Sequence, residues 1–341
     1  MISSIRARPQ SMWSRMRYLR PGAEVAAAYA VLAALGVLGA LKSPLFLSGA
    51  NLSNVGLQAV TLSLLAIGQT FVLLGGGVDM SVGSTVTLTS LIGAILMNGR
   101  DGSMLYVLPL LLALGVAIGF ANGLLVNLLR VEPFIVTFGT FFILEGLGSL
   151  ISLQPVGQTP PAMLNLYVAT WGGVPVPVVL IALVWCAAGL LLRRSRFGWR
   201  VLAVGGRAEV AQLSGIPVAR VRLATYALSG ATAALAGMFT LVVQGLGNPT
   251  AGTNLEFLSI TAAAVGGVSL AGGRGTLVGA LGGVLILTTI GNLLQLLHVN
   301  TFYEQPLQGV VILVAVATRL RRPAILTRRA MLMKTTERGV L

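Results

Sequence analysis

The chain has 341 residues, of which 55% are hydrophobic and only 9% are charged, and its mean hydropathy is +0.89. A soluble domain carries about 25% charged residues, so this composition excludes a soluble enzyme and a disordered chain, and one cysteine excludes a secreted disulfide scaffold. The 43 glycines are typical of helices that pack closely in lipid, whereas the net charge of +14 is informative only through its placement.

Ten apolar segments approach the length of about 20 residues that a helix needs to cross a bilayer. Their runs are continuous, which favours helices over the alternating strands of a membrane barrel. The predicted spans are 24–41, 55–75, 79–97, 104–129, 134–153, 176–192, 223–245, 256–272, 276–297 and 304–319. The sequence therefore predicts an all-α polytopic membrane protein with about ten transmembrane helices.

The basic residues predict the orientation of these spans, because cytoplasmic loops carry an excess of Lys and Arg. With ten spans and both termini cytoplasmic, 21 of the 23 Lys and Arg residues lie inside, and only Lys42 and Arg100 lie outside. This explains the positive charge without a nucleic-acid partner. It predicts three parts: a basic cytoplasmic tail (1–22), a transmembrane domain (23–320) with a large inner loop at 193–222, and a second basic tail (321–341).

The first apolar segment follows the basic N-terminal residues and has no clear cleavage site of small residues. It is interpreted as a first membrane anchor and not as a removed signal peptide.

The first Gly-rich break lies at 75–84 and contains Asp79 and Ser81. Ionisable residues within a span are costly and are functional candidates. Asp79 is expected either to cap the following helix or to contact a polar solute, and the two roles are compatible. A second break at 266–275 resembles the first, which indicates either an internal duplication or convergent Gly-rich packing.

Glu145 lies within the fifth span, and Phe134, Phe138 and Phe141 share its helical face. This face is expected either to line a sugar path or to pack against lipid and neighbouring helices, with Glu145 near a helix end. Three amides in apolar segments are expected to form hydrogen bonds between helices: Asn122, Asn127 and Gln244.

The inner loop is predicted to contain an amphipathic helix of one or two turns that begins near Ala208 and is stopped by Gly215 and Pro217. Such a helix either docks into a groove of a partner protein or lies on the membrane surface.

Motifs of nucleotide and covalent chemistry are missing from the sequence. Neither Lys42 nor Lys334 ends a phosphate-binding loop, and no nucleophile elbow is present. One histidine, His298, and one cysteine, Cys186, give no metal cluster or Cys–His pair; His298 is expected at a helix end near the interface. We therefore expect no enzymatic activity, metal or cofactor in this chain, and any uphill transport must draw energy from a partner or an ion gradient.

Four blocks carry a resemblance to a known family: 75–84, 131–140, 205–222 and 265–279. The chain resembles the permease subunits of ribose-type (simple sugar) ABC importers, which are related to branched-chain amino-acid ABC permeases. The likeness covers about residues 50–320. Where the family commonly has Gly-Gly-Ile-Asp-Leu-Ser, residues 76–81 have Gly-Gly-Val-Asp-Met-Ser, and Glu132 replaces the first proline of a Pro-Pro-Phe motif.

The resemblance implies import of a monosaccharide or related small polyol through a pore formed with a second permease subunit, identical or paralogous. It also implies an ABC ATP-binding subunit that binds ATP and Mg, an extracytoplasmic sugar-binding protein, and a location in the bacterial cytoplasmic (inner) membrane. The inner helix would then couple to the ATPase, through Arg207, Ala208, Glu209, Ala211, Gln212, Leu213, Gly215, Ile216 and Pro217. The candidate translocation path comprises Asp79, Ser81, Phe134, Phe138 and Glu145.

Two other functions stay open at this point. A gradient-driven secondary transporter of a small polar solute would need an acid relay, which Asp79 or Glu145 could begin. A membrane scaffold without transport would leave solute uptake intact when the chain is deleted.

Overall fold

The structure is a computed structural model that describes residues 22–299, 303, 306 and 309–310. Its helices are α2 (Gly22–Lys42), α3 (Gly49–Leu74), α4 (Val82–Met97), η1 (Asp101–Ser103), α5 (Met104–Leu129), α6 (Pro133–Ile151), α7 (Pro161–Val168), α8 (Val176–Arg194), α9 (Arg196–Gly206), α10 (Ala208–Leu213), α11 (Val218–Gln244), α12 (Leu255–Val265) and α13 (Leu277–Leu296). Within the described residues, the only sheet is the antiparallel pair β1 (Thr170–Trp171) and β2 (Val174–Pro175).

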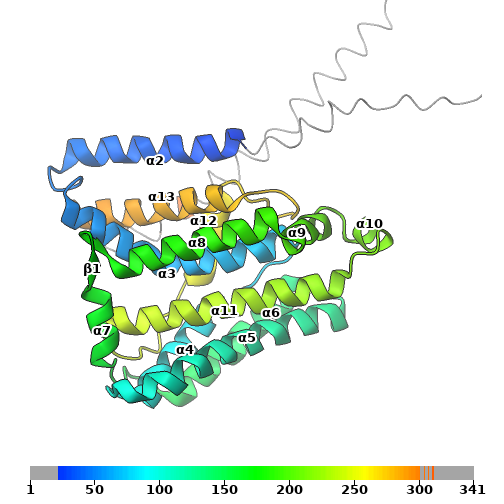
Figure 1. The fold of residues 1–341 in the computed structure, drawn as a ribbon, viewed down its shortest axis with the longest axis horizontal. Coiled ribbons are helices and arrows are strands. Elements are labelled where there is room, and N and C mark those ends of the chain that lie inside the picture. The colour runs from blue at the N-terminus through cyan, green and yellow to red at the C-terminus, as the bar shows by residue number, and fades with distance from the viewer. Residues whose placement is uncertain (1–21, 300–302, 304–305, 307–308, 311–341) are drawn as a thin grey trace, which may run out of the picture.

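The long helices lie side by side in two layers (Figure 1). One layer holds α2, α13, α12, α8 and α3, and the other holds α11, α4, α5 and α6. Helix α11 packs against α3, α4 and α5 and so joins the layers. The short helices α9 and α10 lie at one end of the bundle, and α7 and β1 lie at the opposite end.

Burial separates a central set of helices from a peripheral set. In α3, 83% of the most apolar window is buried, and in α11 and α13 the share is 67%. In α2, by contrast, the share is 11%, and in α6 it is 22%. Apolar helices with exposed outer faces are expected where lipid is the solvent, so the fold is that of an all-α polytopic membrane protein.

Within the described residues, seven helical segments are long and apolar enough to cross a membrane: α2, α3, η1 with α5, α6, α8, α11 and α13. They match seven of the predicted spans. All but three residues of the predicted span 304–319 lie outside the described residues, as do residues 1–21 and 321–341 of the predicted tails.

Two predicted spans are shorter than the sequence suggested. Helix α4 has 16 residues and begins at Val82, and α12 has 11 residues and ends at Val265. At 1.5 Å per residue they extend about 24 and 17 Å, less than a hydrocarbon core of about 30 Å. Glycine is the cause in α12, because Gly267, two residues after Val265, has a φ of +99°, where a helix cannot continue. Ahead of α4, the chain stays non-helical from Gly75 to Ser81.

Glycines bring the backbones of α5 and α11 into contact. A Cβ on Gly115 would collide with the carbonyl oxygen of Gly230, and one on Gly119 would collide with that of Tyr226. Small residues permit such close helix crossings in membranes. The high glycine content therefore serves close packing here, as the composition indicated.

Candidate functional site

The segment between α3 and α4 is an unwound stretch inside the bundle. Helix α3 ends at Leu74, and the chain turns at Gly75–Gly77 before α4 begins at Val82. The carbonyl of Val78 within this stretch accepts hydrogen bonds from the hydroxyl groups of Thr137 and Tyr226, each at 3.2 Å. Side chains of α6 and α11 thereby satisfy a backbone group that the broken helix leaves free.

Asp79 is the centre of a buried polar network that joins four elements. Its Oδ1 accepts from the amide (3.0 Å) and hydroxyl (2.7 Å) of Ser81, and its Oδ2 accepts from the Ser229 hydroxyl of α11 (2.8 Å). Asn122 of α5 donates to Ser81 Oγ at 2.8 Å and accepts from Thr140 of α6 at 2.6 Å. Asp79 is only 1% exposed, and Asn122 and Ser229 are fully covered. The network therefore fixes the break against α5, α6 and α11.

The expectation that Asp79 caps the following helix needs correction. Ser81 is the N-cap residue of α4, and its side chain makes no capping hydrogen bond. Helix α4 begins two residues later than an Asp79 N-cap would require, and the Asp79 carboxylate instead closes the short turn to Ser81 and also accepts from Ser229 on another helix.

Three Gly-rich segments that are distant in sequence meet next to this break. The amide of Gly273 donates to the carbonyl of Leu74 at 3.0 Å. A Cβ on Gly205, near the end of α9, would collide with that same carbonyl and would lie 2.7 Å from the amide nitrogen of Gly273. A Cβ on Gly272 would lie 2.9 Å from the Cα of Gly76. We call Gly76, Gly205, Gly272 and Gly273 the glycine junction; it joins both predicted breaks to the end of α9.

Helix α10 follows the glycine junction directly. It covers Ala208–Leu213, and the chain reverses at Gly215, whose φ is +80°. Ala211 is buried, whereas Val210 and Leu213 are 52% and 89% exposed. The predicted amphipathic helix and its glycine stop are thus confirmed, and its exposed apolar side chains are available to a partner. Helix α9, which precedes it, was not predicted.

The aromatic stripe of α6 forms a stack along the helix. Phe134 and Phe138 have ring centroids 5.2 Å apart, and those of Phe138 and Phe141 are 5.9 Å apart. Phe134 is 47% exposed, and Glu145 is exposed. Glu145 lies six residues before the end of α6 and forms no salt bridge with any described residue. A lipid-exposed carboxylate at this position is costly, so this face requires a protein neighbour or water.

Helix α6 thus carries Phe134, Phe138 and Glu145 on a surface-accessible face, while Asp79 and Ser81 lie in the interior of the bundle. The candidate residues are linked through Thr140, which is on α6 and bonds the Asn122 of the Asp79 network.

The three amides behave differently from one another. Asn122 and Asn127 form the expected interhelical hydrogen bonds, the latter to the carbonyl of Ala219 at 2.9 Å. Gln244 is exposed at the last turn of α11, and its side chain makes no hydrogen bond to any described residue. His298 follows the end of α13 with a φ of +55°, which agrees with its expected position at a helix end.

The sequence reasoning missed one buried acid. Glu256 is 3% exposed, its Oε2 has no hydrogen-bond partner among the described residues, and it lies where a Cβ on Gly83 would be. The sequence did contain a sign of this acid, because Glu256 is the first residue of the predicted span 256–272. A charged residue at the edge of a span is usually at the membrane interface, so its burial was not expected. No group of three or more His, Cys, Asp or Glu side chains in the described part of the chain could hold a metal.

Apolar membrane-spanning helices and a buried polar network at a helix break define a polytopic membrane protein, which also carries a short exposed helix at one end of the bundle. The chain belongs to the family described as branched-chain amino acid transport system / permease component, whose family model matches residues 51–316.

Among its relatives, the ribose import permease protein RbsC of Escherichia coli (strain K12) is 36% identical over 292 residues, which cover 84% of this chain and 90% of that protein. The ribose import permease protein RbsC of Bacillus subtilis (strain 168) is 36% identical, with coverage of 85% and 91%. The D-allose transport system permease protein AlsC of Escherichia coli (strain K12) is 34% identical, with coverage of 83% and 87%. No solved structure is significantly similar to the chain.

Proposed function

We propose that this chain is the membrane permease subunit of an ABC importer that moves a monosaccharide or related small polyol into the cytoplasm. The observation that carries the proposal is the 36% identity, over 84% of this chain, to a ribose import permease. ATP and Mg are bound by a separate ATP-binding subunit, and this chain itself catalyses no reaction. A secreted sugar-binding protein delivers the solute from outside.

In the proposed topology, ten helical segments lie in the bacterial inner membrane, of which α4 and α12 cross it together with the unwound residues beside them, and both termini are cytoplasmic. The parts are the basic tail 1–22, the transmembrane domain 23–320 and the basic tail 321–341. The distribution of Lys and Arg supports this orientation, with 21 of 23 inside. The clustering of α9 and α10 at one end of the bundle agrees with it, because the loop 193–222 is strongly basic.

Coupling to ATP hydrolysis is proposed to run through α10 and the glycine junction. The exposed side chains of α10, above all Leu213, dock into a groove on the ATP-binding subunit. A displacement of α10 reaches Gly205 within three residues of the helix start, and Gly205 contacts the backbone of Leu74 and Gly273. Because backbone atoms touch, the breaks on either side must move with α9.

The translocation path is proposed to follow the exposed face of α6, opposite a second permease subunit, identical or paralogous. Glu145 supports this position, since it is exposed within an apolar span and needs a polar environment. The rings of Phe134 and Phe138 offer faces on which a sugar ring can stack. Asp79 and Ser81 act from the interior, by holding the break that adjoins this face through Asn122 and Thr140.

Deletion of the gene and measurement of sugar uptake test this function. We expect the deletion strain to lose binding-protein-dependent uptake of D-ribose or D-allose, and the intact gene to restore it. If the deletion strain takes up these sugars as fast as the wild-type strain, that result would contradict a transport role and favour a scaffold.

A further inference from the structure

The connection between α11 and α12 does not stay at the end of the bundle. Residues Gly245–Asn254, here called the connecting segment, form bends and turns and run back along α4. A Cβ on Gly247 would lie 2.8 Å from the Cβ of Ala94, and the amide of Gly252 donates to Thr87 Oγ1 at 2.9 Å. Gly252 also contacts the backbone of Gly83. The residues of α4 from 83 to 94 extend about 16 Å, so the segment descends by about half a bilayer core.

The inner end of the connecting segment lies at membrane depth. Asp79, four residues before Gly83, bonds Ser229, which is eleven residues into α11 and therefore about 16 Å from the start of that helix. The predicted span in α11 begins at residue 223, so Ser229 lies about 9 Å into the membrane from the inner side, and the break, with Gly252 next to it, lies within the bilayer. Irregular backbone at this depth occurs only where protein covers it or where it lines a water-filled cavity.

Polar side chains of the connecting segment are not covered by protein. Thr250, Thr253 and Asn254 are exposed, and Asn248 is half-buried. Asn248 Oδ1 accepts from the amide and hydroxyl of Thr250, both at 2.9 Å, which fixes the turn. The side chains of Thr253 and Asn254 form no hydrogen bond with described residues. Lipid cannot satisfy these groups, whereas water or a hydroxylated solute can.

The connecting segment and α6 pack against the same part of α4. Thr87 of α4, whose hydroxyl accepts from Gly252, is also 3.7 Å from the position of a Cβ on Gly148 of α6. Gly148 is one turn beyond Glu145 in α6. The connecting segment therefore lies near the part of α6 that carries Glu145, whereas Phe134 is 14 residues, or about 21 Å, from Gly148 along the helix.

We propose that the connecting segment lines the translocation path and that Thr253 and Asn254 exchange hydrogen bonds with the hydroxyl groups of an uncharged polyhydroxylated solute. This inference rests on the proposed function for the identity of the solute. Its structural part, that the segment faces water at membrane depth, does not depend on which solute is transported.

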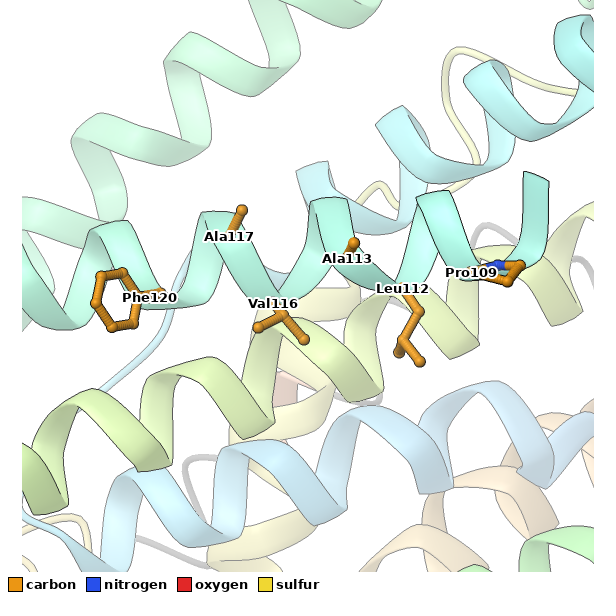
Figure 2. A pocket seen from close by; sticks show the side chains of 6 residues that line it. All are labelled: Pro109, Leu112, Ala113, Val116, Ala117 and Phe120. Carbon is orange, nitrogen blue, oxygen red and sulfur yellow. The ribbon is translucent and has the colours of Figure 1, made fainter. Parts of the chain in front are cut away.

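Cysteine accessibility tests the structural part. In the assembled complex with Cys186→Ser as background, the charged reagent 2-sulfonatoethyl methanethiosulfonate is applied to Thr253→Cys and to Val116→Cys. Val116 lies in an apolar hollow on the outer face of α5, where every lining residue is apolar (Figure 2). Val116 is six residues, or about 9 Å along α5, from Asn122, which bonds Ser81 close to Gly83 and Gly252. Val116 and Thr253 therefore lie at comparable membrane depth. The reagent needs a hydrated thiolate, so we expect Thr253→Cys to react and Val116→Cys to show no reaction.

Matched threonine variants test solute contact. Thr253→Val removes one hydroxyl and is expected to lower D-ribose uptake about two- to tenfold, the effect of one neutral hydrogen bond. The control is Thr261→Val, because the Thr261 hydroxyl donates only to the carbonyl of Phe257 in its own helix, at 2.6 Å. Equal uptake by both variants would overturn the solute contact.

The outcomes separate this inference from the proposed function. If the complex imports D-ribose but Thr253→Cys does not react, the connecting segment is covered by lipid or protein and the inference is wrong, while the proposed function stands. If Thr253→Cys reacts but the unsubstituted complex imports no sugar, the segment still lines an aqueous path and the proposed function is wrong.

Discussion

The glycine junction predicts different effects for two adjacent alanine substitutions in α9: Gly205→Ala should impair coupling, and Gly206→Ala should not. A methyl group on Gly205 would collide with the carbonyl oxygen of Leu74 and approach the amide nitrogen of Gly273 to 2.7 Å, whereas one on Gly206 would meet nothing within 4 Å. Both positions are helical, so alanine favours the helix at each by about 1 kcal/mol. Only Gly205→Ala must also separate three backbone segments.

Overpacking of this kind costs about 1–3 kcal/mol, and backbone atoms cannot avoid it by changing a rotamer. If the junction changes geometry between the two transport states, the same energy alters their equilibrium by about 5- to 150-fold. We therefore expect Gly205→Ala to reduce the solute imported per ATP hydrolysed by at least about fivefold, and Gly206→Ala to leave this ratio unchanged.

The assay is solute uptake and ATP hydrolysis measured together in proteoliposomes that contain the complete complex. Thermal unfolding of each purified variant, followed by size-exclusion chromatography, shows whether Gly205→Ala still folds. A folded Gly205→Ala complex with the same uptake per ATP as Gly206→Ala would refute the role of the junction in coupling.

Three further tests address separate parts of the structure. Asp79→Asn replaces one of the two buried acceptor oxygens that serve Ser81 and Ser229, so it should lower uptake and reduce the free energy of unfolding by about 1–3 kcal/mol. Asp101→Asn, at the exposed start of η1, keeps an oxygen for the hydrogen bond from the Ala162 amide and should leave both unchanged. Equal uptake in the two variants would remove the special role of Asp79. Glu209→Lys reverses the charge in the first turn of α10 and should retain ATP hydrolysis but lose uptake, so normal values of both would argue against docking through α10. Asn51 and Asn292 exchange two hydrogen bonds, at 3.0 and 2.9 Å, between α3 and α13. A double-mutant cycle with leucine at both positions should give a coupling energy of about 0.6–1.7 kcal/mol in thermal unfolding, and additive effects would contradict the pair.

Features encoded by neighbouring residues could be predicted from the sequence. The long apolar runs predicted the seven long spans, and Gly215 with Pro217 predicted the end of α10. In each case the physical cause lies within a few residues: apolar length for the spans, and a positive φ for the helix end.

Features that depend on distant residues could not be predicted in this way. Asp79 has a local signal for an N-cap, but its second oxygen bonds Ser229, 150 residues away, and this partner is invisible in a local pattern. Gly205 resembles any glycine near a helix end until Gly273 is placed against it. The connecting segment falls between two predicted spans, and only its contacts with α4 reveal its depth.

The energy source of transport tests the central claim most directly. We predict that the complete complex, reconstituted with its ATP-binding subunit and sugar-binding protein, imports a radiolabelled monosaccharide only with ATP on the cytoplasmic side, and that a protonophore or a sodium ionophore does not slow the import. Import that proceeds without ATP and is abolished by an ionophore would contradict the account and identify the chain as a gradient-driven transporter.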